Sequence, residues 1–408
     1  MKVKITPSKC QGEIRIPPSK SYLHRALIAA ALAGETSTIY NVNYSNDICE
    51  TLDCLEKLGA NFDKHSTYIK VNNCLKQNAV LEIAASATTL RLLIPILLVL
   101  FKKVNIVVKE NLKKRPLIEY ERLFKAKGLY YDYQDNLNIS GTLKAGIYEL
   151  EGDISSQFVS GLLFALPLLK GDSEIRLKQL TSLNYIFMTL EVLKKYGVEI
   201  KYFDKVFYIK GSQKYQAINY FVEADYSQAA FYMGLATINN DLTIKGLVFN
   251  SIQGDRAILD YVNYDFFEGN YLVKKHQLEY LNIDLENIPD LAPVLFILAI
   301  LNKGGTFSNI NRLKYKESDR VGDFLKMLED YQVNYKLSAN TLELAPGYFP
   351  KTPIEVNCFK DHRLVMAMSI LASVSRYSVI IKDANAINKS YPDFFKDLKK
   401  LGIKVEII

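Results

Sequence analysis

The sequence predicts an α/β protein built from six similar units, with three units in each of two domains. A polar or small-residue start followed by a long apolar stretch recurs six times, at intervals of 63 to 71 residues. Amphipathic helices and short β-rich runs such as "KVNIVVKE", "NDLTIKGLVF" and "YSVIIKDA" follow these starts. Because self-similarity at a fixed period indicates a repeated structural unit, we expect each repeat to have the order β-α-β-α-β-β.

The first helix of each unit is apolar on nearly all sides, which is typical of a buried helix. The six stretches are "SKSYLHRALIAAAL" (from Ser19), "SATTLRLLIPILL" (Ser86), "SSQFVSGLLFALPLL" (Ser155), "YSQAAFYMGLATI" (Tyr226), "PDLAPVLFILAI" (Pro289) and "KDHRLVMAMSILAS" (Lys360). The sequence therefore predicts six buried helices.

The second helix of each unit has apolar residues near i, i+3, i+4 and i+7, which predicts an amphipathic helix on the outside. The five clear copies lie in 49–62, 118–133, 191–202, 319–335 and 394–408. Four of them run into a glycine that can adopt the left-handed conformation common after a helix, namely Gly59, Gly128, Gly197 and Gly402. The fourth unit, near "DYVNYDFFEGNYL", is the weakest copy.

The composition indicates an ordinary globular protein. Of the 408 residues, 49% are hydrophobic and 23% are charged, and the net charge is +7. We find no dense basic block, so we expect neither nucleic acid nor a membrane as partner; small anionic substrates or a solvated Lys-rich surface fit the mild positive charge. The longest apolar run, 92–101, is about half the length that crosses a bilayer. The N-terminus lacks an apolar signal core, so the expected location is cytoplasmic.

The five cysteines are odd in number and lack metal-ligand spacing, so they are expected to be reduced thiols. They are Cys10, Cys49, Cys54, Cys74 and Cys358.

Several of the apolar helices begin with side chains that bind anions or transfer protons. Lys20, Ser21 and Arg25 open the first, and His362 and Arg363 open the sixth. One serine at a helix start is usually only a cap. Repeated starts of this kind indicate that the buried helices direct their N-termini, with their unpaired N–H groups and positive dipole ends, at one anionic ligand site.

At this level of detail the sequence resembles the 5-enolpyruvylshikimate-3-phosphate synthase family from end to end. The matching segments are "PPSKSYLHRALIAAAL", "ATTLR", "KKRPL", "GDISSQFVSGLL", "VEADYSQAAFY", "NSIQGD", "IPDLAP", "KESDR", "KDHRLVMA" and "NKSYPDFF". The resemblance implies the enolpyruvyl transferase fold, a two-domain inside-out α/β barrel of six βαβαββ units. It also implies domains of 1–13 with 224–408 and of 14–223, hinges near 12–15 and 222–226, and an active site in the cleft between the domains.

The resemblance implies transfer of the enolpyruvyl group of phosphoenolpyruvate to the 5-hydroxyl of shikimate 3-phosphate, with release of phosphate. The reaction serves the shikimate pathway and hence aromatic amino-acid biosynthesis, and it proceeds through a tetrahedral intermediate. Both substrates carry several negative charges, which explains the converging cations. The family needs neither a metal nor an organic cofactor, and we expect a monomer.

The family motifs also imply roles for individual residues. Asp290 is the expected base near the 5-hydroxyl, Glu317 the proton donor to the methylene carbon, and Lys20 a catalytic residue that touches both substrates. The residues expected to bind shikimate 3-phosphate are Lys20, Ser21, Arg25, Ser155, Ser156, Gln157, Ser182, Tyr185, Asp290 and Lys316. Those expected to bind phosphoenolpyruvate are Lys20, Arg115, Gln157, Arg320, Arg363 and Lys389.

The sequence departs from the family pattern at three places. The start of the second buried helix has alanines where the family has two glycines and a polar residue, in Ala84, Ala85, Ser86, Ala87 and Thr88. Leu183-Asn184 replaces the usual Lys-Pro, and Asn46-Asp47 replaces an acidic pair. These changes concern fine geometry and affinity, whereas the charged catalytic set is complete.

Two other functions were weighed. The sister enolpyruvyl transferase that acts on UDP-N-acetylglucosamine typically has a catalytic cysteine in the loop that corresponds to 109–116, which reads "KENLKKRP" here, and it typically has Lys-Asn where this chain has Lys20-Ser21. A non-catalytic scaffold of six units would have no need to keep Asp290, Glu317 and Lys389 together.

Ala87 leads to a prediction about glyphosate, which occupies the phosphoenolpyruvate position in this family. A methyl group in place of the usual glycine narrows that position, and glyphosate is longer than phosphoenolpyruvate. Overpacking of this kind costs about 1–3 kcal/mol, which corresponds to roughly ten- to hundredfold weaker inhibition. We therefore expect glyphosate tolerance, and restored sensitivity in Ala87→Gly, when inhibition constants are measured on both forms. If Ala84 and Ala87 only adjust helix packing, the two constants will agree.

Overall fold

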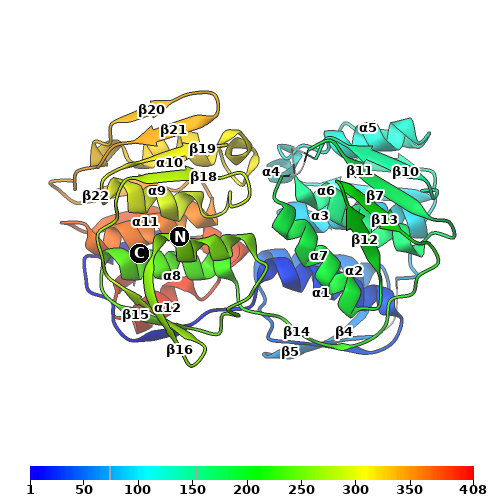
Figure 1. The fold of residues 1–408 in the computed structure, drawn as a ribbon, viewed down its shortest axis with the longest axis horizontal. Coiled ribbons are helices and arrows are strands. Elements are labelled where there is room, and N and C mark those ends of the chain that lie inside the picture. The colour runs from blue at the N-terminus through cyan, green and yellow to red at the C-terminus, as the bar shows by residue number, and fades with distance from the viewer. Residues whose placement is uncertain (73–74, 153–154, 180) are drawn as a thin grey trace. The chain divides into compact units, whose positions relative to one another are not determined.

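The computed structural model describes residues 1–72, 75–152, 155–179 and 181–408 (Figure 1). The chain divides into two compact units: unit 1 comprises Met1–Pro17 and Ala224–Ile408, and unit 2 comprises Pro18–Glu223. The first boundary therefore falls after Pro17 and not after residue 13 as expected. The reason is a short strand, β2 (Glu13–Arg15), which pairs in parallel with β15 (Leu242–Lys245) of unit 1.

The strands of the described residues form six four-stranded sheets, three in each unit. All six share one pattern, in which two strands pair in parallel and the remaining pairings are antiparallel. This common pattern is the structural counterpart of the six sequence repeats.

The three sheets of unit 1 have the strand orders β22 (Ile354–Asn357)–β23 (Val379–Lys382)–β1 (Val3–Thr6)–β24 (Lys404–Ile407), β16 (Asn263–Phe267)–β17 (Asn270–Lys274)–β15–β2, and β18 (Leu281–Asp284)–β19 (Gly305–Ser308)–β21 (Thr341–Leu344)–β20 (Tyr335–Leu337). The three sheets of unit 2 have the orders β14 (Asn219–Phe221)–β3 (Ser37–Tyr40)–β5 (Tyr68–Asn72)–β4 (Asn61–Lys64), β6 (Leu81–Ile83)–β7 (Lys103–Val108)–β9 (Leu137–Ser140)–β8 (Tyr130–Tyr133), and β10 (Ile147–Leu150)–β11 (Ser173–Leu177)–β13 (Val206–Ile209)–β12 (Ile200–Phe203).

A buried helix directly precedes one strand of every parallel pair, and these are the six helices that the sequence predicts. These helices are α1 (Lys20–Ala33), α3 (Ala87–Leu100) and α6 (Ser156–Ala165) in unit 2, and α8 (Tyr226–Ile238), α9 (Ala292–Ile300) and α11 (His362–Val374) in unit 1. In unit 1 the three helices pack against one another inside the sheets (Figure 1). Five of the six have a side-chain N-cap: Ser19, Ser86, Ser155, Asp225 and Asp361.

The second helices are amphipathic and end as expected. They are α2 (Asn46–Lys57), α5 (Ile118–Ala126), α7 (Leu183–Lys195), α10 (Arg320–Met327) and α12 (Phe394–Lys400). Gly59, Gly128, Gly197 and Gly402 follow four of them with φ of 107°, 74°, 80° and 89°. In the fourth unit the place of the second helix is taken by the 3₁₀ segment η2 (Gly254–Tyr261), which agrees with the weak copy in the sequence. The remaining short helices are α4 (Glu110–Lys113), η1 (Leu166–Leu168), η3 (Asn311–Tyr315), η4 (Glu329–Tyr331) and η5 (Ala384–Lys389).

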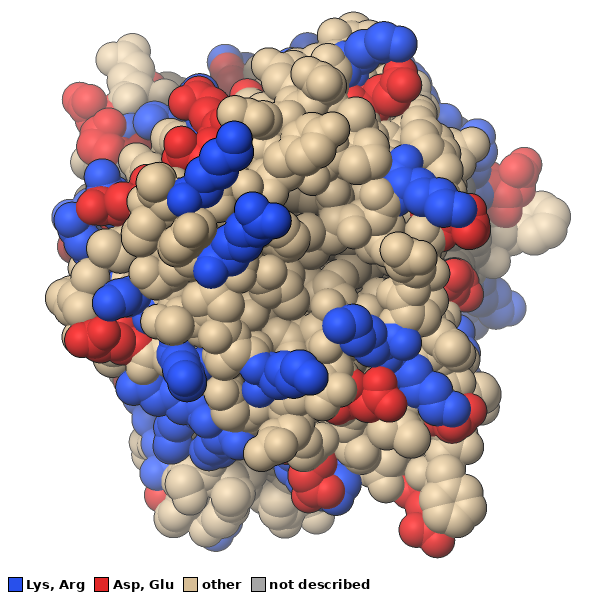
Figure 2. Space-filling model, turned by 90° about the vertical axis from the view of Figure 1, so that its left-hand side faces the viewer, with Lys and Arg blue, Asp and Glu red and all other residues tan. Residues whose placement is uncertain are grey.

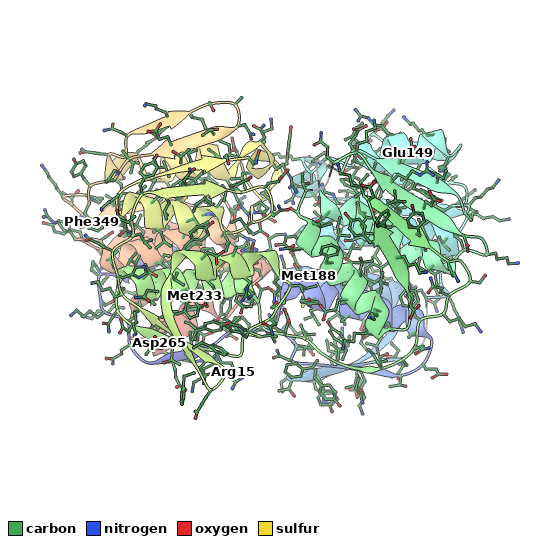
Figure 3. All side chains as sticks on the ribbon, in the orientation of Figure 1. Arg15, Glu149, Met188, Met233, Asp265 and Phe349 are labelled. Atoms are coloured by element: carbon green, nitrogen blue, oxygen red, sulfur yellow. The ribbon has the colours of Figure 1, made fainter. Side chains whose placement is uncertain are left out.

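Each unit has its own hydrophobic core, centred on its buried helices. Met188 of α7 and Met233 of α8 lie inside the two cores, whereas Arg15, Glu149 and Asp265 lie on the surface (Figure 3). Cys10, Cys49, Cys54 and Cys358 are free thiols, and Cys74 lies outside the described residues. No helix in the described part of the chain has the length and apolar character needed to cross a membrane.

The C-terminal ends of α8, α9 and α11 border a hollow of about 920 Å³ in unit 1. Lys9, Lys275 and His276 are among its lining residues. The positive side chains of Lys9 and Lys275 complement the negative dipole ends of these helices, which gives both lysines a structural role there. The face shown in Figure 2 likewise has Lys and Arg side chains around a hollowed, mostly uncharged area.

Gly161 of α6 leads to a prediction about packing. A Cβ atom there would meet the hydroxyl of Tyr120, the backbone oxygen of Arg91 at 2.5 Å and Cγ of Pro95 at 3.2 Å. Tyr120 cannot move freely, because its hydroxyl donates hydrogen bonds to the backbone oxygens of Arg91 and Phe158. We expect Gly161→Ala to lower the free energy of unfolding by about 1–3 kcal/mol in urea denaturation.

The matched control is Gly234→Ala in α8. Its added Cβ would first meet Cγ2 of Val294, at 2.6 Å, which is part of a side chain and not of the backbone. We expect a smaller loss there, since a side chain can shift. Equal losses in the two variants would contradict the close backbone approach as the cause.

Candidate active site

Lys20 is the first residue of α1, and its ammonium group pairs with the first turn of α2. Lys20 Nζ lies 2.7 Å from Asp47 Oδ2, and both side chains are largely buried. Ser19 is the N-cap of α1, so neighbouring Ser21 is not needed for capping. The helix start therefore presents a cation that is held by one carboxylate.

Arg25 is buried and connects α1 with α7. It donates hydrogen bonds to Thr189 Oγ1 at 2.8 Å and to the backbone oxygens of Ser21 and Tyr185 at 2.7 and 3.0 Å. Burial lowers the pKa of Arg25 to about 10, so the guanidinium is charged at neutral pH. Ser182, just before α7, has φ 52° and ψ 42°, a left-handed conformation that is uncommon for serine. Arg25 thus joins the start of α1 at Ser21 to the first turns of α7 at Tyr185 and Thr189.

Gln157 lies in the first turn of α6, after Ser155 and Ser156, and a buried arginine fixes its amide. Arg91 of α3 donates to Gln157 Oε1 at 3.0 Å and to the backbone oxygen of Pro116 at 2.8 Å. The amide nitrogen of Gln157 donates to Thr88 Oγ1 at 2.8 Å. Arg91 therefore positions both Gln157 and the turn that carries Arg115.

Arg320 organises the acidic residues of unit 1. Its side chain is 1% exposed and contacts three carboxylates. The distances are 2.7 Å to Asp290 Oδ1, 2.6 Å to Glu317 Oε2 and 2.8 Å to Asp361 Oδ2. One guanidinium thus holds the expected base and the expected proton donor in fixed positions.

Asp290 has two further cationic neighbours. Lys316 Nζ lies 3.2 Å from Asp290 Oδ1, and Arg363 Nη2 lies 3.1 Å from Asp290 Oδ2. Burial by itself would raise the pKa of Asp290, but the charges of Arg363, Lys316 and Arg320 outweigh it and hold this pKa well below its ordinary value. Burial lowers the pKa of Lys316 to about 8, even though Asp290 opposes the change. Lys316 therefore titrates close to neutral pH.

Lys389 and His362 belong to adjoining segments of unit 1. Lys389 is the last residue of η5, and the next residue, Ser390, shares a short hydrogen bond with Nδ1 of His362 at the start of α11. Potential ligand atoms of Glu317, Asp361 and His362 lie within 4.8 Å of one another. Both of these carboxylates accept hydrogen bonds from Arg320, which already supplies a positive charge to this group.

Comparisons with known proteins identify the family. A family model described as EPSP synthase (3-phosphoshikimate 1-carboxyvinyltransferase) matches residues 5–398. The chain belongs to the EPSP synthase family. The 3-phosphoshikimate 1-carboxyvinyltransferase of Clostridium perfringens is 40% identical over 422 aligned residues, which cover 98% of each chain.

Solved structures confirm the fold. The structure of EPSP synthase from Acinetobacter baumannii has a TM-score of 0.81 at 21% identity and covers 99% of both chains. The enolpyruvyl transferase NikO from Streptomyces tendae has a TM-score of 0.83 at 15% identity and covers 99% of this chain and 98% of its own. The predicted fold of the EPSP synthase family is therefore correct.

The site residues expected for this EPSP synthase family member are divided between the two units. Unit 2 carries Lys20, Ser21, Arg25, Arg115, Ser155, Ser156, Gln157, Ser182 and Tyr185, and unit 1 carries Asp290, Lys316, Glu317, Arg320, Arg363 and Lys389. Ion pairs within unit 1 join five of these residues into one cluster: Asp290, Lys316, Glu317, Arg320 and Arg363. Within unit 2, contacts join Arg25 to Ser21 and Tyr185.

Three buried charged residues were missing from the sequence-based site. Arg91 positions Gln157, Asp361 binds Arg320, and Asp255 receives a short hydrogen bond from Ser227. All three lie in quoted family segments, namely "ATTLR", "KDHRLVMA" and "NSIQGD", and that was the available signal. Burial, strengthened by the charge of Asp290, raises the pKa of Asp255 to about 7, while Arg363 and Ser227 act in the opposite direction.

Asp255 leads to a prediction about stability and pH. Its pKa is about 7 in the folded protein and 3.8 ordinarily, so between these values the folded state binds a proton that the unfolded state has lost. Stability from this group therefore falls as the pH rises from about 4 to about 7. We therefore expect the free energy of unfolding of Asp255→Asn, minus that of the wild type, to increase by about 2 kcal/mol from pH 5 to pH 7. Urea denaturation at a series of pH values measures this difference.

The control variant is Asp265→Asn, which alters an exposed aspartate paired with exposed Lys274. Its stability should follow the wild-type curve. If the Asp255→Asn and wild-type curves also run parallel across this range, Asp255 does not carry the extra proton.

Proposed function

We propose that the protein transfers the enolpyruvyl group of phosphoenolpyruvate to the 5-hydroxyl of shikimate 3-phosphate and releases phosphate. Membership of the EPSP synthase family and the names of close relatives support this reaction. The observation that carries it is the contact of Arg320 with Asp290 and Glu317, since it joins an anion-binding group to two candidate proton-transfer groups. The reaction belongs to aromatic biosynthesis through the shikimate pathway.

In the addition step, the 5-hydroxyl oxygen bonds to C2 of phosphoenolpyruvate and the methylene carbon C3 gains a proton. Asp290 is proposed to take the hydroxyl proton and Glu317 to donate the proton to C3. In the elimination step, the C2–O bond to phosphate breaks and the methyl group returns a proton, which restores the double bond. The atoms balance without any group beyond the two substrates.

The charges around Asp290 suggest how substrate binding would activate it. With Arg320, Arg363 and Lys316 around it, Asp290 is ionised and only weakly basic. The carboxylate and phosphate of phosphoenolpyruvate are proposed to form ion pairs with Arg320 and Arg363. The positive charge acting on Asp290 would then be smaller, and the pKa of Asp290 would rise toward the range useful for a base. Lys316, with a pKa of about 8, is mostly protonated at neutral pH and is one of the cations that act on Asp290.

Substrate binding is proposed to use residues of both units. Lys20, Arg115, Gln157, Arg320, Arg363 and Lys389 would bind phosphoenolpyruvate. Lys20, Ser21, Arg25, Ser155, Ser156, Gln157, Ser182, Tyr185, Asp290 and Lys316 would bind shikimate 3-phosphate. Buried Arg25 would act mainly through the segments it holds, because its guanidinium is engaged with Thr189 and two backbone oxygens.

The fold alone does not separate this function from its sister reaction, because NikO is also described as an enolpyruvyl transferase. The loop 109–116, which contains α4, has no cysteine in its sequence, and this disfavours UDP-N-acetylglucosamine as the acceptor. A phosphate-release assay with phosphoenolpyruvate and either acceptor tests the choice. Release with UDP-N-acetylglucosamine but not with shikimate 3-phosphate would refute the proposal.

The same assay tests the proton-transfer roles. We expect Asp290→Ala and Glu317→Gln to lower kcat by at least about two orders of magnitude, as positioned acid–base groups do. Thermal unfolding of each variant checks that the fold is kept. Glu329→Gln, at an exposed position just after α10, is the control and should keep wild-type kcat. Near-normal kcat in either active-site variant would exclude the assigned role.

A further inference from the structure

One face of α2 contacts the starts of two buried helices. Asp47, Glu50 and Thr51 have the i, i+3, i+4 spacing that places side chains on one side of a helix. Asp47 pairs with Lys20 at the start of α1. Thr51 Oγ1 lies 2.7 Å from His24 Nδ1 of α1 and 2.6 Å from Thr89 Oγ1 of α3.

Glu50 completes this face by binding the segment that leads into α3. Its carboxylate accepts hydrogen bonds from three consecutive backbone N–H groups. Ala84 N lies 2.6 Å from Oε1, Ala85 N lies 3.2 and 3.4 Å from the two oxygens, and Ser86 N lies 2.7 Å from Oε2. Successive N–H groups that converge in this way form an anion-binding concavity, and here its anion is a side chain of the same protein.

The side chains of this segment are small. Ala84, Ala85 and Ala87 carry only methyl groups, and these are the positions where the sequence departs from its family. Ser86 uses its hydroxyl to cap α3 at Thr89 N. Among the described contacts of the backbone at 84–86, the N–H groups donate to Glu50, and the carbonyl oxygen of Ser86 accepts a hydrogen bond from Leu90 N in α3.

The segment 84–86 is connected to the proposed substrate site by hydrogen bonds from the start of α3. Thr88, in the first turn of α3, accepts a hydrogen bond from Gln157, and Arg91, one turn later, binds Gln157 and the carbonyl next to Arg115. Gln157 and Arg115 are both proposed to bind phosphoenolpyruvate. A displacement of the backbone at 84–86 would therefore also displace Gln157 and Arg115.

We infer that Glu50 is a positioning residue which sets the affinity for phosphoenolpyruvate by fixing the backbone of 84–86. This inference rests on the proposed function. It assigns Glu50 no contact with the substrate and no proton transfer. It also explains how a segment of alanines can keep a defined shape where the family uses glycines and a polar side chain.

The test is steady-state kinetics of the whole protein with Glu50→Gln. The amide keeps the size of the side chain but loses the charge and one acceptor oxygen. Hydrogen bonds to charged groups are among the stronger ones in proteins, so we expect the KM for phosphoenolpyruvate to rise about tenfold. We expect kcat to stay within about twofold, and the Kd of shikimate 3-phosphate, measured alone by calorimetry, to stay unchanged.

Two further variants complete the design. Glu56→Gln alters another glutamate of α2, which pairs only with Lys64 in an exposed ion pair among the described contacts, and it should match wild type. Glu50→Asp keeps the charge but shortens the side chain by one methylene group. It should raise the KM for phosphoenolpyruvate less than Glu50→Gln does, and it serves as the test if the Gln variant does not fold.

The outcomes separate the inference from the proposed function. An unchanged KM for phosphoenolpyruvate in Glu50→Gln overturns the inference. Equal losses of affinity for both substrates overturn it as well, because Glu50 would then be a general structural brace. No phosphate release by the wild-type protein would refute the proposed function itself, before any variant is compared.

Discussion

The acidic residues of unit 1 depend on one buried guanidinium. Asp290, Glu317 and Asp361 lie close together in a place with little access to water, and three unpaired negative charges there would repel one another strongly. Arg320 contacts all three. The same acids raise the pKa of Arg320 in spite of its burial, so its charge is secure at any ordinary pH. Without this cation, the cluster would have to take up protons or come apart.

In unit 2, the Lys20–Asp47 ion pair stands beside two buried arginines that make hydrogen bonds to neutral groups. Its buried arginines, Arg25 and Arg91, bind backbone oxygens and neutral side chains, and each connects helix starts that are distant in sequence. The two units therefore share a fold but not an electrostatic design. Unit 1 gathers buried carboxylates around one guanidinium, whereas the buried arginines of unit 2 orient neutral polar partners.

The repeated pattern made much of the fold predictable from the sequence. Long apolar stretches could only be buried helices, and a glycine such as Gly59 marks a helix end because its φ of 107° is costly for other residues. Expected roles for Asp290 and Lys20 came from family motifs. Arg91 was missed because its importance depends on α3, α6 and the Pro116 turn meeting in space. Asp255 was missed because it lies in η2, where the repeat is weakest. The boundary at Pro17 depended on β2, a strand too short to recognise.

The strand pairing of unit 1 also has a consequence for the newly made chain. Strand β1, at the N-terminus, pairs with β23 and β24, which end at Lys382 and Ile407. On the ribosome, β1 must therefore remain unpaired until β23 and β24 have been made. Unit 2 has all its strands once Phe221 of β14 has emerged. Because domains generally fold as units and in the order of synthesis, unit 2 can fold first, and the exposed N-terminal strand is the part that a chaperone would have to protect.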